Sequence, residues 1–308
     1  MPTAEPATEP CRRGWCIAEA CRLEATAAKP GNVRPGASFP DLDHADLVIA
    51  GLSIAPAFEA APGRALGRTI LGAVSASRRT TRSNANLGII LATAPLAAVP
   101  GDGADAASAI GGARVVLARL SPGDAADVWE AIAQARPGGM GSAPAHDLAG
   151  PPPPDLRAAM HAAAAHDRIA RLWTEGWEPL LDGPVADLLA AIDDGHTLGD
   201  AIVRAYLHQL AREPDSLVAR RHGADAAAEV SRTAARIAAL PRAAWRDAVA
   251  AFDRALRLPR RVNPGTTADL CAAALYVVLR DGRLHARLGG PGTGPTPRSL
   301  RLSQRAAG

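Results

Sequence analysis

The sequence Asn263-Pro264-Gly265-Thr266-Thr267-Ala268-Asp269-Leu270 begins a predicted helix that continues through the apolar run after it. Asn263 is a good N-cap, and Pro264 suits the first helical position because its missing N–H would have no partner there. The free N–H groups of such a start favour an anion. Thr266 and Asp269 are three residues apart, so a hydroxyl and a carboxylate share one face. A well-capped core helix without a ligand is the simpler interpretation of this stretch alone.

The composition of the 308-residue chain indicates an all-helical protein. Hydrophobic residues make up 48% of it, aromatic residues only 3%, and alanine, which has the highest helix propensity, dominates. No stretch of alternating apolar and polar residues is long enough to predict a sheet. We therefore predict an all-α fold, a single multi-helix domain with functional loops at the ends of its helices.

The chain divides into a helical domain at 11–284 and two ends, 1–10 and 285–308, that we expect to be disordered. A Pro-rich connector at 142–154 divides two domains or lies across the surface of one. We favour one domain, because candidate functional residues lie on both sides of the connector. Periodicity and breakers predict helices at 11–28, 44–60, 63–80, 87–99, 113–120, 123–136, 155–176, 179–192, 198–211, 224–240 and 243–256.

Several classes of partner and compartment are excluded by composition. The formal charge of +3 and the scarcity of aromatic residues argue against a nucleic-acid partner. The first ten residues do not resemble a signal peptide, and no apolar run is long enough to cross a membrane. We therefore expect a soluble, cytoplasmic protein, and a homo-oligomer is compatible with the sequence.

The cysteines do not form a metal-binding pattern. Cys11, Cys16 and Cys21 recur every five residues, a spacing that turns each thiol away from the last on a helix and suits neither zinc nor an iron–sulfur cluster. Together with Cys271, we expect them to be ordinary packing thiols in a reducing compartment.

The end of the first predicted helix brings two opposite charges together. The helix stops at Lys29-Pro30-Gly31-Asn32-Val33, because Pro30 disfavours helix at the residue before it. Lys29 is thereby held beside Glu24, which lies at the edge of the apolar stripe. A solvated lysine is the alternative.

A pair of carboxylates precedes the second predicted helix, in Asp41-Leu42-Asp43. One aspartate is enough to cap that helix. Two of them, with Asp46 one turn later, suit Mg²⁺, which prefers one or two carboxylates together with substrate phosphates. Capping remains the competing interpretation.

Two further helix starts resemble the first. Ser83-Asn84-Ala85-Asn86-Leu87-Gly88 precedes a segment that is apolar on every side and therefore expected to be buried. Arg78, Arg79 and Arg82 come just before it, and two amides with three arginines suit a polyphosphate. Capping explains the asparagines equally well, but it does not explain the arginines. In Arg220-Arg221-His222-Gly223, the glycine allows a sharp turn and the guanidinium groups match phosphate oxygens.

Asp167 is a further candidate for a functional residue. The spacing of Leu156, Met160, Ala163 and Ala170 places Asp167 in the apolar stripe of the predicted 155–176 helix. A carboxylate is costly there unless it is paired or used in chemistry. A buried structural ion pair is the alternative.

No common nucleotide, hydrolase or metal motif is present. Six motifs instead occur in an order that resembles the triphosphoribosyl-dephospho-coenzyme A synthase family, over about residues 15–282. They are Lys29-Pro-Gly-Asn-Val, Asp41-x-Asp, Asn84-x-Asn-Leu-Gly with Leu91-x-x-x-Pro-Leu, Pro137-Gly-Gly-x-Gly, Ala219-Arg-Arg-His-Gly and Asn263-Pro-Gly-Thr-Thr-Ala-Asp-Leu.

The resemblance implies an all-helical transferase. In that family, the 2′-hydroxyl of 3′-dephospho-CoA attacks ribose C1′ of ATP, adenine leaves, and 2′-(5″-triphosphoribosyl)-3′-dephospho-CoA forms. The substrates would be ATP and dephospho-CoA, and the cofactor Mg²⁺.

The reaction needs a carboxylate near C1′, an acid for adenine and a base for the hydroxyl. Asp269 is our candidate for the stabilising carboxylate and Asp167 for the base, with Glu24 as a third candidate for these roles. We assign the triphosphate to Lys29, Arg220 and Arg221. We assign the metal ion to Asp41 and Asp43, and the recognition of the sugar or base to Asn84 and Asn86. Asn32, His222, Thr266 and Thr267 complete the candidate nucleotide site.

The departures from the family pattern concern the acceptor. In the branch that serves citrate lyase, the stretch matching 84–88 reads Asn-Thr-His-Lys-Gly, whereas here Asn86 and Leu87 replace the histidine and the lysine. The sequence is more similar to the archaeal and methylotroph-type branch. An ATP-using transferase that acts on a methanopterin-like one-carbon carrier precursor is therefore one alternative, and a non-catalytic helical nucleotide-binding protein is another.

Overall fold

The structure is a computed structural model that describes residues 12–81, 84–101, 106–136 and 150–288. Within these ranges every regular element is a helix, and two isolated bridges in the 34–42 segment are the extended pairings, so the all-α prediction is confirmed. Residues 1–11, most of the predicted connector and residues 289–308 lie outside the described part.

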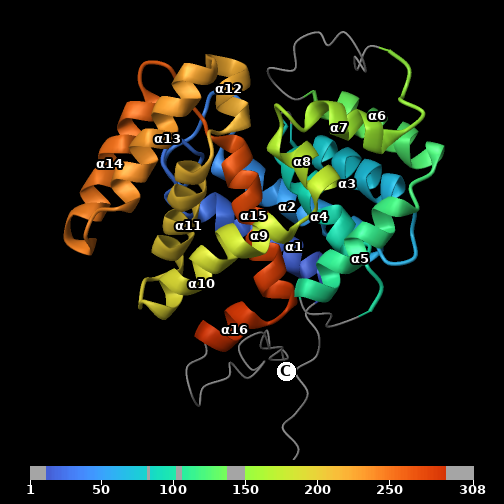
Figure 1. Cartoon of the computed structure of the whole chain (residues 1–308), viewed down its shortest axis with the longest axis horizontal. Helices are drawn as coiled ribbons and strands as arrows, with labels where there is room; N and C mark the ends of the chain where they lie inside the picture. Colours follow the sequence, from blue (N-terminus) through green and yellow to red (C-terminus); the bar gives the residue numbers. More distant parts are fainter. Residues whose placement is uncertain (1–11, 82–83, 102–105, 137–149, 289–308) are drawn as a thin grey trace, which may run out of the picture.

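The helices follow one another in the order shown by the colours of Figure 1. They are α1 (Arg13–Thr26), α2 (His44–Glu59), α3 (Leu66–Thr80), α4 (Leu87–Ala97), α5 (Ala106–Ala118), α6 (Pro122–Ala135), α7 (Leu156–Ala163), α8 (Arg168–Glu175), α9 (Glu178–Leu180), the π-helical turn η1 (Leu181–Val185), α10 (Ala186–Asp193), α11 (Leu198–Arg212), α12 (Ser216–His222), α13 (Ala224–Ala238), α14 (Arg242–Arg257), α15 (Gly265–Arg280) and α16 (Arg283–Leu288).

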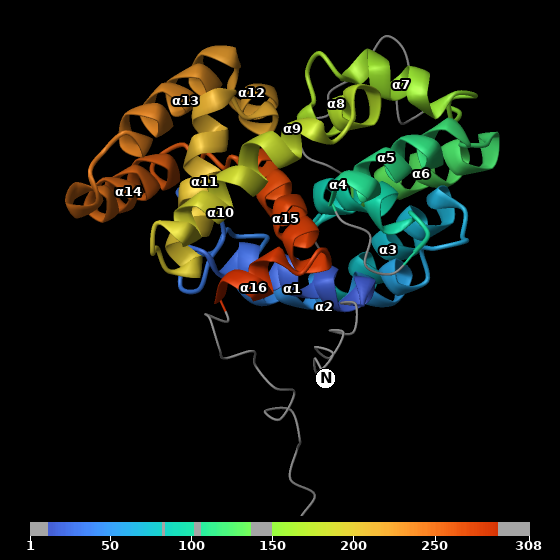
Figure 2. The same cartoon turned by 60° about the horizontal axis from the view of Figure 1, so that its bottom comes forward.

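Helix α15 lies at the centre of the molecule. Helices α11 to α14 lie on one side of it and α3 to α8 on the other, while α1 and α2 cross beneath (Figures 1 and 2). It packs against α1 and α4, and small side chains such as Ala272 and Ala273 allow these helices to come close. Every residue from Thr266 to Val278 is buried except Asp269.

Helix α4 is buried in the same way. Each of its residues is buried except Gly88. The all-round apolar pattern of this segment therefore marks a core helix, as predicted. Asp269 and Gly88 are thus the partly open positions of two core helices, and both face the same cavity.

The structure corrects several predicted boundaries. Helix α5 begins at Ala106 and not near 113. Gly112, within it, leaves room for the side chain of Val99, which would lie 2.4 Å from a Cβ there. Helix α16 continues to Leu288, so the predicted disorder from 285 is wrong as far as that residue. Buried Leu284 and an ion pair of 2.8 Å between Arg287 and Asp193 hold it.

The predicted single helix at 155–176 is wrong, because the chain breaks it into α7 and α8. Asp167 is the N-cap of α8, where Oδ1 accepts hydrogen bonds from Ile169 N (2.8 Å) and Ala170 N (3.2 Å). Its local backbone bonds compete with continued helix, as aspartate bonds often do. Asp167 therefore lies at a helix start and not within an apolar stripe.

Two smaller expectations concern cysteines and membranes. Cys16 is disulfide-bonded, so the expectation of a packing thiol is wrong for this residue, whereas Cys21 and Cys271 are free and buried. None of the helices in the described part combines the length and apolar character that a bilayer crossing needs.

Candidate active site

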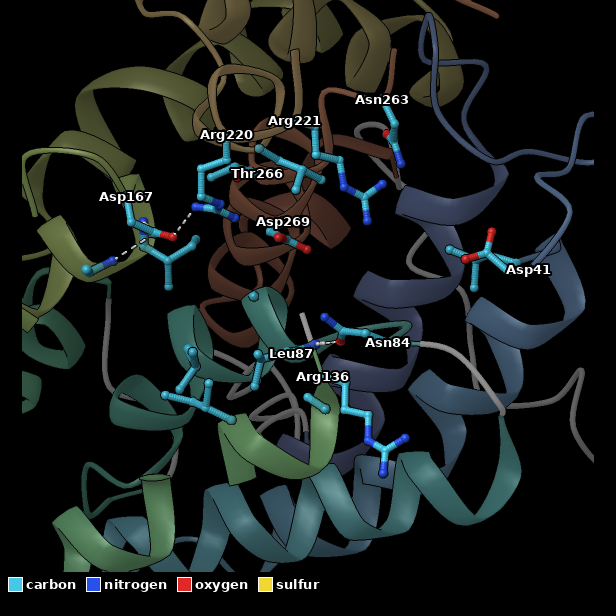
Figure 3. A pocket seen from close by; sticks show the side chains of 18 of the residues that line it. Asp41, Asn84, Leu87, Arg136, Asp167, Arg220, Arg221, Asn263, Thr266 and Asp269 are labelled. Atoms are coloured by element: carbon cyan, nitrogen blue, oxygen red, sulfur yellow. Dashed lines mark hydrogen bonds and ion pairs between the residues drawn. The ribbon is translucent and has the colours of Figure 1, made fainter. Parts of the chain in front are cut away.

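A cavity of about 730 Å³ opens beside the N-terminal ends of α4, α8 and α15 (Figure 3). A volume of this size suits a nucleotide-sized ligand. The walls come from α3, α4, α6, α7, α8, α12 and α15 and from the 39–42 segment. Their polar residues are Asp41, Arg78, Asn84, Arg136, Asp167, Arg220, Arg221, Arg261, Asn263, Thr266 and Asp269.

Asp269 is the carboxyl group at the back of this cavity. Its Oδ2 would lie 2.0 Å from a Cβ at residue 88, so Gly88 is what allows the carboxyl to sit against the start of α4. Burial, and then the negative charges of Glu24, Asp215 and Asp167, hold the pKa of Asp269 well above its usual value. Asp269 therefore keeps its proton to a higher pH than an ordinary aspartate.

Gly88→Ala is expected to reduce turnover about a hundredfold, because the added methyl group must displace the carboxyl or the helix start. The measurement is turnover in the adenine-release assay given below. Gly72→Ala in α3 is the control, since the nearest atom would lie 4.0 Å from its Cβ, and it should leave turnover unchanged. Equal rates in both variants would contradict the importance of this contact.

Asp167 and Arg220 form an ion pair at the edge of the cavity. Asp167 Oδ2 lies 2.5 Å from Arg220 Nη1, while Oδ1 caps α8. Both carboxylate oxygens are therefore engaged, which makes Asp167 a positioning residue for Arg220. Arg221 on the same helix, α12, is exposed and also lines the cavity.

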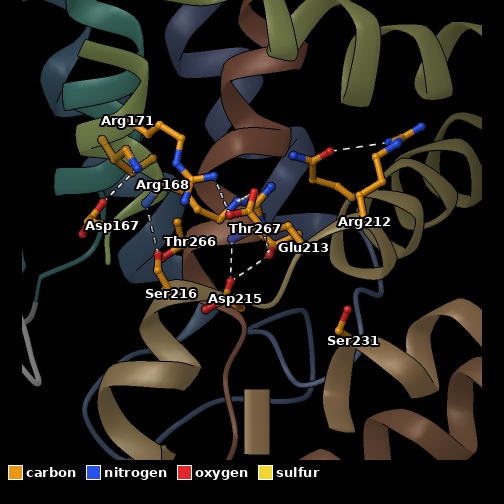
Figure 4. Close-up of polar contacts among 12 residues, drawn as sticks. Asp167, Arg168, Arg171, Arg212, Glu213, Asp215, Ser216, Ser231, Thr266 and Thr267 are labelled. Carbon is orange, nitrogen blue, oxygen red and sulfur yellow. Dashed lines mark hydrogen bonds and ion pairs between the residues drawn. The ribbon is translucent and has the colours of Figure 1, made fainter. Parts of the chain in front are cut away.

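The start of α15 is held by Asp215, a residue that belongs to none of the predicted site motifs (Figure 4). Asp215 is fully buried, and its Oδ1 accepts from Leu217 N (2.9 Å) and Val218 N (3.0 Å) at the start of α12. Its Oδ2 accepts from Thr267 N (2.7 Å) and Thr267 Oγ1 (2.8 Å). One carboxylate thus caps two helices.

This arrangement corrects the predicted cap. The side chain of Asn263 makes no cap hydrogen bond, α15 begins at Gly265, and Asn263 Oδ1 accepts instead from Asn32 Nδ2 at 3.0 Å. Thr267 is turned into the protein toward Asp215. Thr266 faces the cavity, where its hydroxyl accepts from Ser216 Oγ at 3.0 Å.

Asp215→Ala is expected to lower the free energy of unfolding by about 3 kcal/mol, because it leaves donors of two buried helix starts without partners. Urea unfolding measures the loss. Asp155→Ala is the matched control: Asp155 caps only α7, at the surface, and its loss should cost about 1 kcal/mol. Equal losses would mean that the bonds to Thr267 contribute nothing.

Seven of the predicted site residues line the cavity, namely Asp41, Asn84, Asp167, Arg220, Arg221, Thr266 and Asp269. The others do not line it, namely Glu24, Lys29, Asn32, Asp43, Asn86, His222 and Thr267. Sequence position alone could not separate pairs such as Asp41 and Asp43, Asn84 and Asn86, or Thr266 and Thr267, because their members are only one or two residues apart.

Lys29 and Glu24 form a buried pair behind the cavity. Lys29 has no exposed surface, and its Nζ lies 2.9 Å from Glu24 Oε1 and also donates to the backbone carbonyl of Glu24. The predicted proximity is confirmed, and the alternative of a solvated lysine is wrong. This location argues against direct contact between Lys29 and a phosphate.

The two asparagines of the 84–88 stretch differ in location. Asn84 lines the cavity, and its Oδ1 accepts from Leu87 N at 3.2 Å. Asn86 is buried, and its Nδ2 has no hydrogen-bond partner within the described ranges. Leu87 itself lines the cavity.

Asp41 and Asp43 also differ in their location. Asp43 caps α2 in a reciprocal pair with Asp46, so the capping interpretation is confirmed for Asp43. Asp41 is exposed and lines the cavity. Among the residues described, no group of three His, Cys, Asp or Glu side chains could hold a metal. Mg²⁺ carried on substrate phosphates usually takes only one or two carboxylates from a protein, and Asp41 could supply one.

Five arginines and three aspartates line the cavity, so its formal charge is positive. Two of these arginines, Arg136 and Arg261, belong to no motif that the sequence analysis used. Guanidinium groups match phosphate oxygens in geometry and charge. A cavity with this lining and a carboxyl of raised pKa at its back suits a polyphosphate substrate that needs a proton donor.

Known proteins match the chain at the level of family and fold. The family model described as ATP:dephospho-CoA triphosphoribosyl transferase matches residues 12–287. A crystal structure from Archaeoglobus fulgidus, provisionally named a triphosphoribosyl-dephospho-coA synthase, is similar with a TM-score of 0.59 and 26% sequence identity. The match covers 76% of this chain and 98% of that one. Among curated proteins, none matches significantly.

Proposed function

Because the chain belongs to the ATP:dephospho-CoA triphosphoribosyl transferase family, and is thus a transferase, we propose that it transfers the triphosphoribosyl group of ATP to 3′-dephospho-CoA. The 2′-hydroxyl of the acceptor attacks ribose C1′, and adenine leaves. The observation that carries the proposal is Asp269, a carboxyl of raised pKa facing an arginine-lined cavity.

Asp269 can serve both proton transfers in sequence. The bond between C1′ and N9 breaks while the carboxyl gives its proton to the departing adenine. The carboxylate that remains stabilises positive charge at C1′. It then takes the proton of the incoming 2′-hydroxyl as the new C1′–O bond forms, which restores the carboxyl and balances the reaction. This assignment needs no second base, in accord with the engaged oxygens of Asp167.

The remaining cavity residues bind and orient the substrates. Arg220 and Arg221 hold the triphosphate, and Asn84 and Thr266 offer hydrogen bonds to the sugar or base. Mg²⁺ held by the phosphates and Asp41 would neutralise part of the triphosphate charge. Glu24 acts from behind the cavity, by keeping the pKa of Asp269 high.

The direct test incubates the full chain with MgATP and 3′-dephospho-CoA and measures free adenine by chromatography. Adenine that appears only with the acceptor, together with the mass of the triphosphoribosyl product, supports the proposal. Absence of adenine with this acceptor would refute it.

A second acceptor is favoured by one specific feature. Leu87, which lines the cavity where the citrate-lyase branch has lysine, removes a positive charge that could meet the acceptor. An aromatic or pterin-like precursor of a one-carbon carrier would tolerate this apolar wall. Adenine release with such a precursor, and not with dephospho-CoA, would identify this function.

A further inference from the structure

Two arginines of the cavity have a backbone conformation that arginine rarely adopts. Arg136, which ends α6, has a φ of 49°, and Arg261, between α14 and α15, has a φ of 52°. They are the non-glycine residues with positive φ in the described part of the chain, and both line the cavity. A residue with a Cβ is strained there, and glycine or asparagine would suit the backbone better.

The side chains of these arginines do not support the fold. Both residues are exposed, and neither guanidinium group forms a hydrogen bond or an ion pair with a residue of the protein in the ranges that the structure describes. A strained backbone conformation at a residue whose side chain neither packs nor pairs within the protein indicates that this side chain binds a ligand.

Arg136 and Arg261 belong to different walls of the cavity. Arg136 follows α6, which packs against α3, the helix that carries Arg78. Arg261 lies between α14 and α15, two residues before Asn263, which Figure 3 shows on the same side of Asp269 as Arg221. Figure 3 shows Arg136 and Arg221 on opposite sides of Asn84 and Asp269. The cavity is therefore basic on two walls, with the reactive carboxyl between them.

We propose that Arg261 binds the triphosphate of ATP, together with Arg220 and Arg221, and that Arg136 binds the diphosphate of the acceptor on the opposite wall. This inference rests on the proposed function. Two polyphosphate chains in one cavity repel each other, and separate basic walls hold them apart while both sugars meet at Asp269. The wall with three arginines suits the more highly charged chain.

Isothermal titration of the full chain with MgATP and, separately, with dephospho-CoA tests this assignment. We expect Arg261→Gly to weaken MgATP binding at least about tenfold and dephospho-CoA binding less than about twofold, as for a lost charge-assisted hydrogen bond. Arg136→Gly should do the reverse. Because glycine relieves the left-handed backbone, the Tm of both variants should stay unchanged or rise by about 2 °C.

Two further sets of variants serve as controls for these binding measurements. Arg136→Asn and Arg261→Asn keep a residue that tolerates positive φ, in case glycine loosens either turn. Arg254→Ala removes an exposed arginine of α14 outside the cavity lining and should change neither affinity.

The proposal is overturned if both ligands bind each glycine variant within about twofold of the wild type, or if one variant loses both ligands equally. A Tm lowered by more than about 5 °C in both the glycine and the asparagine variants would also overturn it, since the arginine would then hold the fold. So would a wild type that binds neither ligand. A wild type that binds both ligands as predicted but releases no adenine would refute the proposed function alone.

Discussion

Asp269→Asn should reduce adenine release at least about a thousandfold, because the amide can neither donate the carboxyl proton to the leaving base nor carry the negative charge that stabilises C1′. The fold should be unchanged, since Asp269 is a partly open position of α15 that makes no cap. Single-turnover release of adenine, followed by chromatography, measures the effect. Asp225→Asn in α13, exposed and remote from the cavity lining, is the control and should retain full activity.

Asp269→Asn should also increase the free energy of unfolding near neutral pH. The pKa of Asp269 is raised in the folded protein above its ordinary value of 3.8, so the folded state binds more protons than the unfolded state between the two pKa values. The stability that this carboxyl contributes is complete below about pH 3.8 and is lost as the pH rises through the folded pKa. Urea unfolding across this window should show a smaller loss of stability in Asp269→Asn than in the wild type. In the activity test, by contrast, near-normal turnover of Asp269→Asn would show that Asp269 takes no part in the mechanism.

The pH dependence of the reaction follows from the same carboxyl. If the protonated form donates to adenine, the rate of the chemical step should fall as the pH rises through the raised pKa of Asp269. In Glu24→Gln the negative charge beside the carboxyl is lost, so this fall should move to lower pH. A rate that rises over the same range would instead assign Asp269 only the role of base.

The fold follows from sequence where one local signal dominates. Alanine content and apolar periodicity are enough to predict an all-helical chain, and the core position of α4 follows from apolar residues on every side. Local pattern does not predict the break before Asp167, because the apolar spacing of α7 and α8 continues across it. In the structure Asp167 both caps α8 and pairs with Arg220, which is 53 residues away in the chain and therefore leaves no local signal.

The site was partly predictable for a similar reason. Helix ends rich in glycine, amides and arginine placed Asn84, Arg220 and Asp269 in one cavity, because polar side chains and unpaired backbone groups collect at helix ends. Nothing local distinguishes Arg136 and Arg261, whose positive φ arises from the turn each must make and leaves no mark in composition. The role of Asp215 at the start of α15 has no local sequence signal either, since its bonds to Thr267 join distant parts of the chain.

Lys29→Met should lower the free energy of unfolding by about 4 kcal/mol, because it leaves Glu24 charged and buried without its counter-ion. Glu24→Gln combined with Lys29→Met should recover most of that loss, since an uncharged pair of similar size costs much less to bury. Urea unfolding of the two single variants and the double variant completes a double-mutant cycle. Additive losses would show that the two charges do not depend on each other.

The cycle also separates a structural role of Lys29 from contact with substrate. Lys29 has no exposed surface, so a phosphate could reach it only after the pair with Glu24 opened. If the lysine acts only through Glu24, the double variant should fold well and bind MgATP within about threefold of the wild type, while the pKa of Asp269 falls with the loss of the Glu24 charge. A stable double variant that no longer binds MgATP would instead place Lys29 on the triphosphate and require the pair to open during the reaction.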